Sequence, residues 1–177
     1  MTKVPDSDEP SGLMVGELTR EDVDDIAGFW VRLVEEHHRI DPRYRLGEDG
    51  PERYRMFLLE SILRPDMAVF VARDAGQAVG YIAGRLMGPA VIYDERLEGV
   101  VQDAYVAPGH RNRGIGSRLL VRLLAHFREK GATNVLLDVS ALNPDAERFW
   151  RRYGFGEFRH TLWISLGGEE RNGGGGQ

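Results

Sequence analysis

The stretch "HRNRGIGSRLL", residues 110–120, decides how the rest of the sequence is interpreted. It combines three arginines with two glycines, and an apolar repeat of helical spacing begins within it. The N-terminus of a helix presents unpaired backbone N–H groups and roughly half a positive charge, so it attracts phosphate oxygens. Glycines let a ligand approach the backbone closely, and arginines add charged hydrogen-bond donors. The stretch therefore predicts a polyphosphate-binding corner where a strand turns into a helix.

The motif differs from the common nucleotide-binding loops. It lacks the lysine and the Ser/Thr of G-x-x-x-x-G-K-[ST], and it is not G-x-G-x-x-G. Hydrolysis of a nucleoside triphosphate therefore loses its main support. By itself, R-x-x-G-x-G from Arg111 to Gly116 also fits an ordinary glycine turn, so the flanking sequence has to decide between the two interpretations.

The flanks alternate between the apolar periods of strands and of helices. The patterns predict strands at residues 13–18, 67–73, 78–86, 98–108 and 134–141, and a final strand or hairpin at 154–166. They predict helices that follow a Thr19/Asp22 start signal, that follow Pro51, that run from Ile115 toward Gly131, and that begin at Asn143. The nearly unbroken apolar run at 134–141 predicts a strand buried between packed layers. The order predicts a mixed sheet flanked by helices.

Length and composition are those of one globular domain: 177 residues, 42% hydrophobic and 29% charged. The absence of cysteine excludes disulfides, thiolate metal sites and cysteine nucleophiles. Polar residues 1–12 and glycine-rich residues 167–177 are predicted to be disordered, which leaves a domain at 13–166. No apolar run reaches the roughly 20 residues that span a bilayer, so we expect a cytoplasmic protein without a membrane partner. The net charge of −5 argues against a nucleic-acid partner.

Together with its flanks, the corner resembles the GNAT superfamily of N-acetyltransferases. The similarity rests on V-x-P-x-x-R-x-x-G-x-G from Val106 to Gly116, on the helix, strand and Asn-led helix that follow, and on "FWRRYGF" at residues 149–155. It covers about residues 15–166 and is most specific from 103 to 155. The resemblance implies an α/β (α+β) fold, with a mostly antiparallel sheet of six to seven strands, a splayed parallel pair and about four helices.

The same resemblance implies acetyl-coenzyme A as co-substrate, no metal, and transfer of acetyl to a primary amine by direct attack in a ternary complex. Backbone groups of Ala104, Tyr105 and Val106 would bind the pantetheine and the thioester carbonyl. Asn143 and Trp150 would lie beside the coenzyme arm. The diphosphate would be enclosed by the corner itself, which comprises Arg111, Asn112, Arg113, Gly114, Ile115, Gly116 and Ser117.

The chemistry needs a proton acceptor and a way to release the thiolate. An alkyl ammonium of pKa about 10.4 is neutral in only about one molecule in a thousand at pH 7. Asp103 is the candidate general base, with Glu98 as an alternative, whereas the amide of Gln102 cannot titrate. Many relatives have a proton-donating tyrosine where this chain has Trp150, whose indole cannot donate a proton to sulfur. Tyr153 is the candidate replacement, and packing in the core is its alternative role.

The acceptor is expected between the first two helices and the last strand, where residues 37–46 and 159–166 are candidate walls. His38 and Asp41 are the candidate acceptor-binding residues. Acidic groups there favour a cationic amine, whereas the arginines of the same stretches favour an acceptor with a carboxylate or phosphate. Small molecules, peptide N-termini and lysine side chains all stay open. Two adjacent histidines without a third ligand do not predict a zinc site.

Two other hypotheses compete with catalysis. Trp150 and Gln102 at positions of expected chemistry fit an acyl-coenzyme A-binding sensor or regulatory module that does not turn over. A nucleic-acid binder would use the arginines of residues 111–130, but these interrupt a helical stripe that otherwise packs on the sheet. The resemblance also allows a homodimer formed through the last strand.

Overall fold

The structure is a computed structural model that describes residues 12–88 and 97–166. The two termini that were predicted to be disordered lie outside these residues, apart from Gly12. The strands are β1 (Leu13–Glu17), β2 (Met67–Asp74), β3 (Gln77–Met87), β4 (Glu98–Val106) and β5 (Asn134–Leu137). The helices are α1 (Val23–Ile40), α2 (Gly50–Ser61), α3 (Ile115–Glu129) and α4 (Pro144–Arg152), with 3-10 turns η1 (Arg20–Asp22) and η2 (Pro108–His110). No helix within the described part of the chain is long and apolar enough to cross a bilayer.

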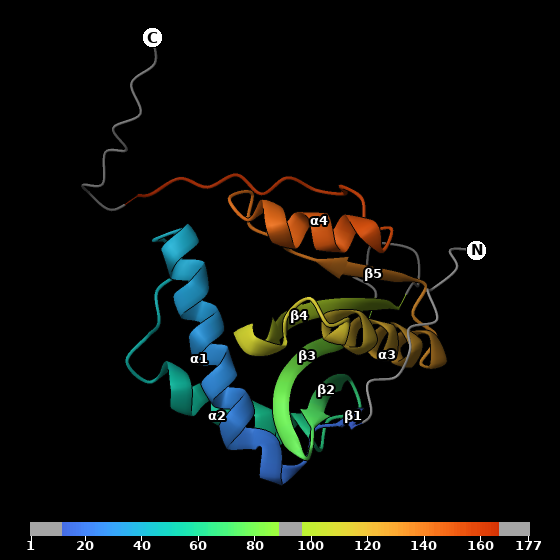
Figure 1. Cartoon of the computed structure of the whole chain (residues 1–177). Coiled ribbons are helices and arrows are strands. Elements are labelled where there is room, and N and C mark those ends of the chain that lie inside the picture. The colour runs from blue at the N-terminus through green and yellow to red at the C-terminus, as the bar shows by residue number, and fades with distance from the viewer. Residues whose placement is uncertain (1–11, 89–96, 167–177) are drawn as a thin grey trace.

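The described residues form one five-stranded sheet in the order β1-β2-β3-β4-β5 (Figure 1). The pairs β1–β2, β2–β3 and β3–β4 are antiparallel, and β4–β5 is parallel. The predicted fold class, a mixed and mostly antiparallel sheet with one parallel pair and about four helices, is confirmed. The sheet has fewer strands than the six to seven that we expected, because residues 155–166 join no ladder.

The segment that was predicted as a final strand instead runs extended from the end of α4 toward the C-terminal end of α1 (Figure 1). Its Trp163 lies against the Arg43 guanidinium, 5.3 Å from the ring centroid, rather than beside β5. Phe155 at the start of the segment is half-buried beside Trp150, but the later apolar residues are exposed, Leu162 to 94% of its surface and Leu166 to 95%. The apolar pattern in the sequence specified an extended backbone but not a strand partner.

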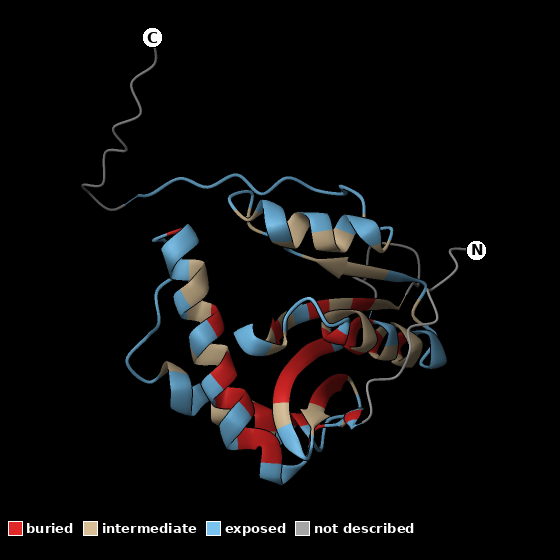
Figure 2. Cartoon of the chain, in the orientation of Figure 1, coloured by how far each residue is buried: buried red, intermediate tan, exposed pale blue. Residues whose placement is uncertain are grey.

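Helices cover both faces of the sheet, because successive strand residues point to opposite sides. Val69 and Val71 of β2 pack with the α1 and α2 side chains, whereas Ala68, Phe70 and Ala72 pack with α3. Figure 2 shows the buried residues concentrated in the central strands and on the sheet-facing sides of the helices. The core is thus divided by the sheet into an α1/α2 layer and an α3/α4 layer.

The predicted start of the first helix is confirmed. The Thr19 hydroxyl and backbone N–H both donate to the Asp22 carboxylate, at 2.7 and 2.8 Å, which closes a capping box at η1 just before α1. The Arg73 guanidinium from β2 also donates to Asp22. Burial by itself would raise the pKa of Asp22, but the hydrogen bonds from Arg73 and Thr19 outweigh it and lower the pKa. The ion pair of Asp22 and Arg73 thus links the start of α1 to strand β2.

Helix α3 lies close against the sheet because two strand residues lack a side chain. A Cβ on Gly99 of β4 would stand 2.3 Å from the Phe127 ring, and one on Gly84 of β3 would stand 2.7 Å from it. Phe127 is fully buried above them. The helix ends at Glu129, with Lys130 as its C-cap, and Gly131 follows with a φ of +87°, as predicted for a glycine that ends a helix.

The pairing of β4 with β5 covers all of β5 but only the first four residues of β4. The parallel ladder runs from Glu98↔Asn134 to Val101↔Leu137, after which β4 continues to Val106 without β5 beside it. The splayed parallel pair that the family resemblance implies is therefore present. The prediction of a buried strand at 134–141 is wrong in two respects, since β5 is four residues long and half-buried. It is the last strand of the described sheet, so only one of its edges is paired.

Candidate active site

An apolar cavity of about 200 Å³ lies where β4 has lost its partner. Strand β4, the first turns of α3 and the inner side of α4 supply most of its walls, through Ala104, Tyr105, Val106, Gly116, Leu119, Ala146, Phe149 and Trp150. The cavity is thus bordered by β4, α3 and α4, the elements that contain or adjoin the corner motif and the "FWRRYGF" motif. A larger hollow of about 420 Å³ lies between α1 and α2, lined by groups such as Asp24 and Glu52, but it does not touch β4.

The glycine-arginine corner forms the start of α3 beside this cavity. Gly114 is the N-cap residue, with a φ of +75° that a residue with a side chain adopts only at a cost, and a Cβ there would meet nothing within 4 Å. Asn112 also has a positive φ, of 62°. Among the described residues no side chain caps the α3 N-terminus. The first backbone N–H groups of α3 are therefore available to an anionic ligand.

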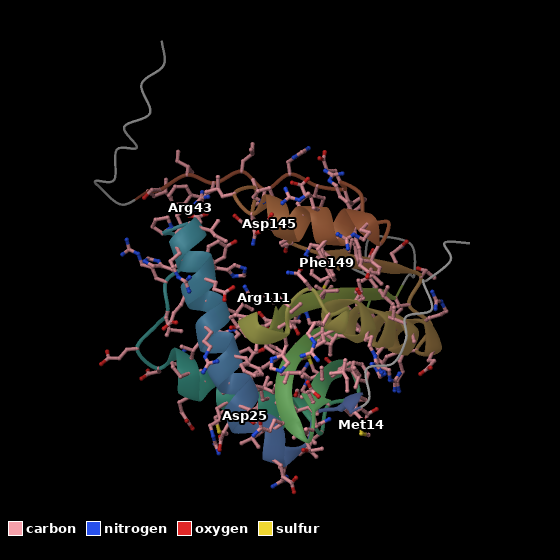
Figure 3. All side chains as sticks on the ribbon, in the orientation of Figure 1. Met14, Asp25, Arg43, Arg111, Asp145 and Phe149 are labelled. Carbon is pink, nitrogen blue, oxygen red and sulfur yellow. The ribbon has the colours of Figure 1, made fainter. Side chains whose placement is uncertain are left out.

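The arginines of the corner are held by other parts of the protein. Arg111 Nη2 donates to the Glu36 carboxylate on α1 at 2.7 and 2.9 Å, and its Nε donates to the Val106 carbonyl at 2.8 Å. Its guanidinium also lies over the Tyr105 ring, 5.4 Å from the centroid. Arg113 lies 3.6 Å from the Asp74 carboxylate at the end of β2. Figure 3 shows Arg111 between α1 and the end of β4.

The candidate base, Asp103, follows a β-bulge in β4. Ala83 pairs with Asp103 and Gly84 pairs with Val101, so Gln102 is the extra residue of the bulge. The Asp103 carboxylate faces α2, where its Oδ2 accepts a hydrogen bond of 3.0 Å from the Tyr54 hydroxyl. Burial raises the pKa of Asp103, while the Tyr54 hydrogen bond and the charge of His37 act in the opposite direction. A carboxyl with a raised pKa is suited to accepting a proton near neutral pH.

The other two residues of β4 that we considered, Gln102 and Glu98, are less suited to act as a general base. Gln102 is exposed and cannot titrate, and Glu98 lies at the first residue of β4, in the part of the strand that still pairs with β5. The Asp103 carboxylate lies on the α1/α2 side of the sheet, where it contacts Tyr54, whereas Ala104 and Val106 border the cavity on the α3/α4 side.

Helix α4 carries Trp150 and is flanked by Asn143 and Tyr153, three residues for which the sequence predicted a role at the site. Trp150 lines the cavity and packs at right angles to Phe149, with ring centroids 4.9 Å apart. Tyr153 packs against Phe149, and its hydroxyl forms a hydrogen bond with the Ser117 hydroxyl in the first turn of α3. The Asn143 side chain accepts a hydrogen bond of 3.0 Å from the Ala146 backbone N–H, so it caps the helix as the sequence predicted.

His38 and Asp41, the candidate acceptor residues, lie at the C-terminal end of α1. His38 is exposed, and its Nδ1 is 2.8 Å from the Tyr44 carbonyl. Asp41 is buried, and its carboxylate accepts hydrogen bonds of 2.6–3.0 Å from the Arg43 guanidinium. This hydrogen bonding lowers the pKa of Asp41. In Figure 3, Arg43 marks this end of α1 and Asp145 marks the N-terminal end of α4.

Sequence reasoning missed Tyr54, Tyr81 and Glu36. Tyr54 and Leu58 are buried at an i, i+4 spacing on α2, a periodicity that predicted their side of the helix but not the partner of the hydroxyl. Glu36 carries no local signal, since its partner Arg111 is 75 residues away. Within the described residues, no three His, Asp or Glu side chains gather in a group that could hold a metal ion.

Comparison with known proteins agrees with this architecture. A sequence model of the acetyltransferase (GNAT) family matches residues 30–155. Streptothricin acetyltransferase of Streptomyces lavendulae is 41% identical over 135 residues, which cover 68% of this chain and 64% of the relative. The IAA acetyltransferase of Azospirillum brasilense is 30% identical over 128 residues, which cover 72% and 76% of the two chains. This chain thus spans under two thirds of the streptothricin acetyltransferase.

A solved structure extends the likeness to the fold. Aminoglycoside N-acetyltransferase AAC(6')-Iy, in complex with CoA, superposes with a TM-score of 0.70 at 17% identity, over 89% of this chain and 96% of that one. The fold and the motif-bearing site define an acetyltransferase-type α/β protein. The chain belongs to the acetyltransferase (GNAT) family, as the resemblance in the sequence indicated.

Proposed function

We propose that this chain is an N-acetyltransferase that moves acetyl from acetyl-coenzyme A to a primary amine by direct attack in a ternary complex. The observation that carries the proposal is the apolar cavity beside the unpaired end of β4, which opens next to an uncapped helix N-terminus. Family membership supports the reaction class, and the AAC(6')-Iy complex with CoA supports the co-substrate.

The described residues fit the coenzyme in three places. The α3 amides at Gly114–Ser117, which lack a side-chain cap among the described residues, would bind the diphosphate oxygens. The backbone of Ala104, Tyr105 and Val106 has no β5 partner, so it offers hydrogen-bonding groups to the amides of the pantetheine arm. The apolar walls from Leu119, Phe149 and Trp150 suit the uncharged part of that arm.

Proton removal from the acceptor falls to Asp103. An ammonium group must lose its proton before it attacks the thioester, and the buried carboxylate of Asp103 is a stronger base than an exposed one because its pKa is raised. Its neighbours are tyrosines and a histidine, with Tyr54 in direct hydrogen-bond contact. We infer that Asp103 accepts the proton directly or through one water.

Release of the thiolate requires little assistance. A thiol of pKa about 8.5 leaves as thiolate at pH 7 at a cost of about 2 kcal/mol. Tyr153 is the proposed proton donor, because it is the phenol next to the first turn of α3, where its hydroxyl bonds to Ser117. Trp150 contributes a wall of the cavity and no transferable proton.

The acceptor is proposed to be a small molecule that carries a primary amine. Streptothricin acetyltransferase among the sequence relatives, and aminoglycoside and glucosamine-6-phosphate N-acetyltransferases among the structures of similar fold, support an amine-bearing small molecule. His38 and Asp41 at the end of α1 are the proposed outer contacts, while Asp103 receives the reacting amine. Cytoplasmic location, the homodimer, and the lack of a metal, membrane or nucleic-acid partner stay predictions.

The test is a panel of amines with acetyl-coenzyme A, in which free thiol is measured with a disulfide dye and acetylated products are identified by mass spectrometry. The panel should include streptothricin-like, aminoglycoside and amino-sugar amines, together with a peptide N-terminus and a lysine peptide. We expect amine-dependent thiol release with a small-molecule amine. Tight coenzyme binding by calorimetry without thiol release from any amine, at any pH from 7 to 9, would instead establish the acyl-coenzyme A-binding module.

A further inference from the structure

Three polar side chains from three different elements meet at the candidate base. Tyr54 comes from α2, Tyr81 from β3 and Asp103 from β4. The Tyr54 hydroxyl lies 3.0 Å from Asp103 Oδ2 and 3.3 Å from the Tyr81 hydroxyl. Tyr54 is 9% exposed and Tyr81 is fully buried. The contact is therefore part of the core on the α1/α2 side of the sheet.

The number of hydroxyl hydrogens among these three side chains decides which residue donates in each hydrogen bond. A tyrosine hydroxyl has one hydrogen to donate. If Tyr54 donates it to the Asp103 carboxylate, the hydrogen between the two hydroxyls has to come from Tyr81. The ionised form of Asp103 thus gives a chain in which Tyr81 donates to Tyr54 and Tyr54 donates to Asp103. A chain of this kind strengthens each of its hydrogen bonds by polarisation.

The Tyr54 ring is held firmly enough to position the carboxylate. The Trp30 indole from α1 stacks on it, with centroids 4.4 Å apart and planes within 7°. Phe57 contacts it from the same helix at 5.4 Å. With the ring fixed on two sides, the hydroxyl has little freedom to move away from Asp103.

We propose that Tyr54, supported by Tyr81, is a positioning residue of the acetyl transfer: it binds Asp103 Oδ2 and thereby keeps the carboxylate ionised, with Oδ1 left to accept the proton of the amine. The inference rests on the proposed function of Asp103 as the base. Asp103 takes one proton from the ammonium group before the neutral amine attacks the thioester carbonyl. Coenzyme A then leaves as the thiolate, and the second proton lost by the nitrogen balances the one that the thiolate takes up. Asp103 returns its proton to solvent after the product leaves. Tyr54 and Tyr81 keep their own protons throughout.

The tyrosines suit this role because their own ionisation is suppressed. Burial is the main cause that raises the pKa of Tyr54 and of Tyr81 well above the ordinary value, and the nearby Asp103 charge adds to it. Both therefore stay protonated, and able to donate, at neutral pH. The groups that face Asp103 are Tyr54 from α2, Tyr81 from β3 and His37 from α1, and Tyr105 of its own strand faces Tyr81.

The test replaces the donor without changing the packing. Tyr54→Phe keeps the ring that stacks on Trp30 and removes only the hydroxyl. Loss of the donor disfavours the carboxylate, so the pKa of Asp103 rises and the acid limb of the kcat/KM profile moves to higher pH by about one unit. We expect the affinity for coenzyme A to stay within about twofold of the wild type, because Tyr54 does not line the cavity proposed for the coenzyme.

Matched variants separate this role from a general disturbance of α2. Ser61→Ala removes another buried hydrogen bond of α2, from the Ser61 hydroxyl to the Leu58 carbonyl, and should leave the profile in place. Tyr81→Phe should also move the acid limb of the kcat/KM profile to higher pH, but by less. This variant serves as the test if Tyr54→Phe does not fold. The shift should also persist in a His37→Gln background, which removes the charge that His37 places near Asp103.

A readout without turnover keeps the two proposals apart. Carbon-13 NMR of labelled aspartate follows the titration of Asp103 in the folded protein, with Asp103→Asn assigning the signal. A higher titration midpoint in Tyr54→Phe supports the inference even if no amine is ever acetylated. An unchanged midpoint overturns it, even if the wild type proves to be an active transferase.

Discussion

The Arg111 guanidinium connects the coenzyme corner to helix α1, because Nη2 binds both oxygens of Glu36 at 2.7 and 2.9 Å while Nε binds the Val106 carbonyl. The pair is partly exposed, with 41% of the Arg111 side chain and 26% of the Glu36 side chain open to solvent. Arg111 was predicted to bind the diphosphate, and Glu36 is paired with the guanidinium that the diphosphate would contact.

This pairing predicts that Glu36 competes with the coenzyme. Glu36→Gln should tighten binding of coenzyme A by about two- to fivefold, since a partly exposed ion pair is worth about 0.2–1 kcal/mol. Glu35→Gln on the exposed side of α1 removes the same charge without touching Arg111, and should leave the affinity unchanged. Titration calorimetry measures both. Equal affinities for the two variants would show that the side chain of Arg111 does not leave Glu36 for the diphosphate.

Gly114 provides a test of the diphosphate site that separates charge from backbone strain. A side chain at this position meets nothing within 4 Å, and Asp and Asn both tolerate a positive φ better than most residues. Gly114→Asp should therefore bind coenzyme A at least tenfold more weakly than Gly114→Asn, because only the former places a negative charge near the phosphates. If the two variants bind alike, the corner is not the diphosphate site.

The role of Tyr153 as the proton donor can be tested by comparing its variant with one of its hydrogen-bond partner, Ser117. If Tyr153 protonates the departing thiolate, Tyr153→Phe should lower kcat about tenfold or more, within the range of general-acid effects. Ser117→Ala removes the same hydrogen bond but keeps the phenol, and should cost turnover less than threefold. Steady-state rates with a fixed amine measure both. An equal loss in the two variants would assign Tyr153 to packing at the α3–α4 contact.

The buried charge of Asp103 should make the protein less stable as the pH rises. Its pKa is raised by burial, so the folded state holds the proton more tightly than the unfolded chain. Stability therefore decreases as the pH rises from the unfolded pKa of about 3.9 through the folded pKa, and the cost is complete above it.

Asp103→Asn should remove this cost while its amide oxygen still accepts from Tyr54. We expect a higher melting temperature at pH 7–8, by about 2–4 °C for each kcal/mol recovered, and a difference that shrinks toward pH 4. Asp25→Asn, at an exposed position of α1, is the control for charge alone. Calorimetry from pH 4 to 8 measures the trend. A lower melting temperature for Asp103→Asn at pH 8 would contradict it.

The sequence by itself determined the features that depend on neighbouring residues. The capping box of Thr19 and Asp22, the αL glycine at Gly114 and the cap at Asn143 are all settled within a few residues, because the backbone conformation there is decided locally. The alternating strands and the helical stripe of α3 assigned each residue to a face. These patterns, together with the corner motif, were sufficient to predict the family and the fold class.

Only the tertiary structure decided which residues meet across the sheet. Tyr54 of α2 reaches Asp103 of β4 over 49 positions and Arg111 reaches Glu36 of α1 over 75, through the packing of helices beside the sheet, which no local pattern specifies. The prediction of a final strand was wrong for the same reason. The sequence pattern indicated an extended chain but not a strand to pair with, and residues 155–166 run toward α1 instead. Periodicity selects a face, whereas a partner is selected by the packing of the whole chain.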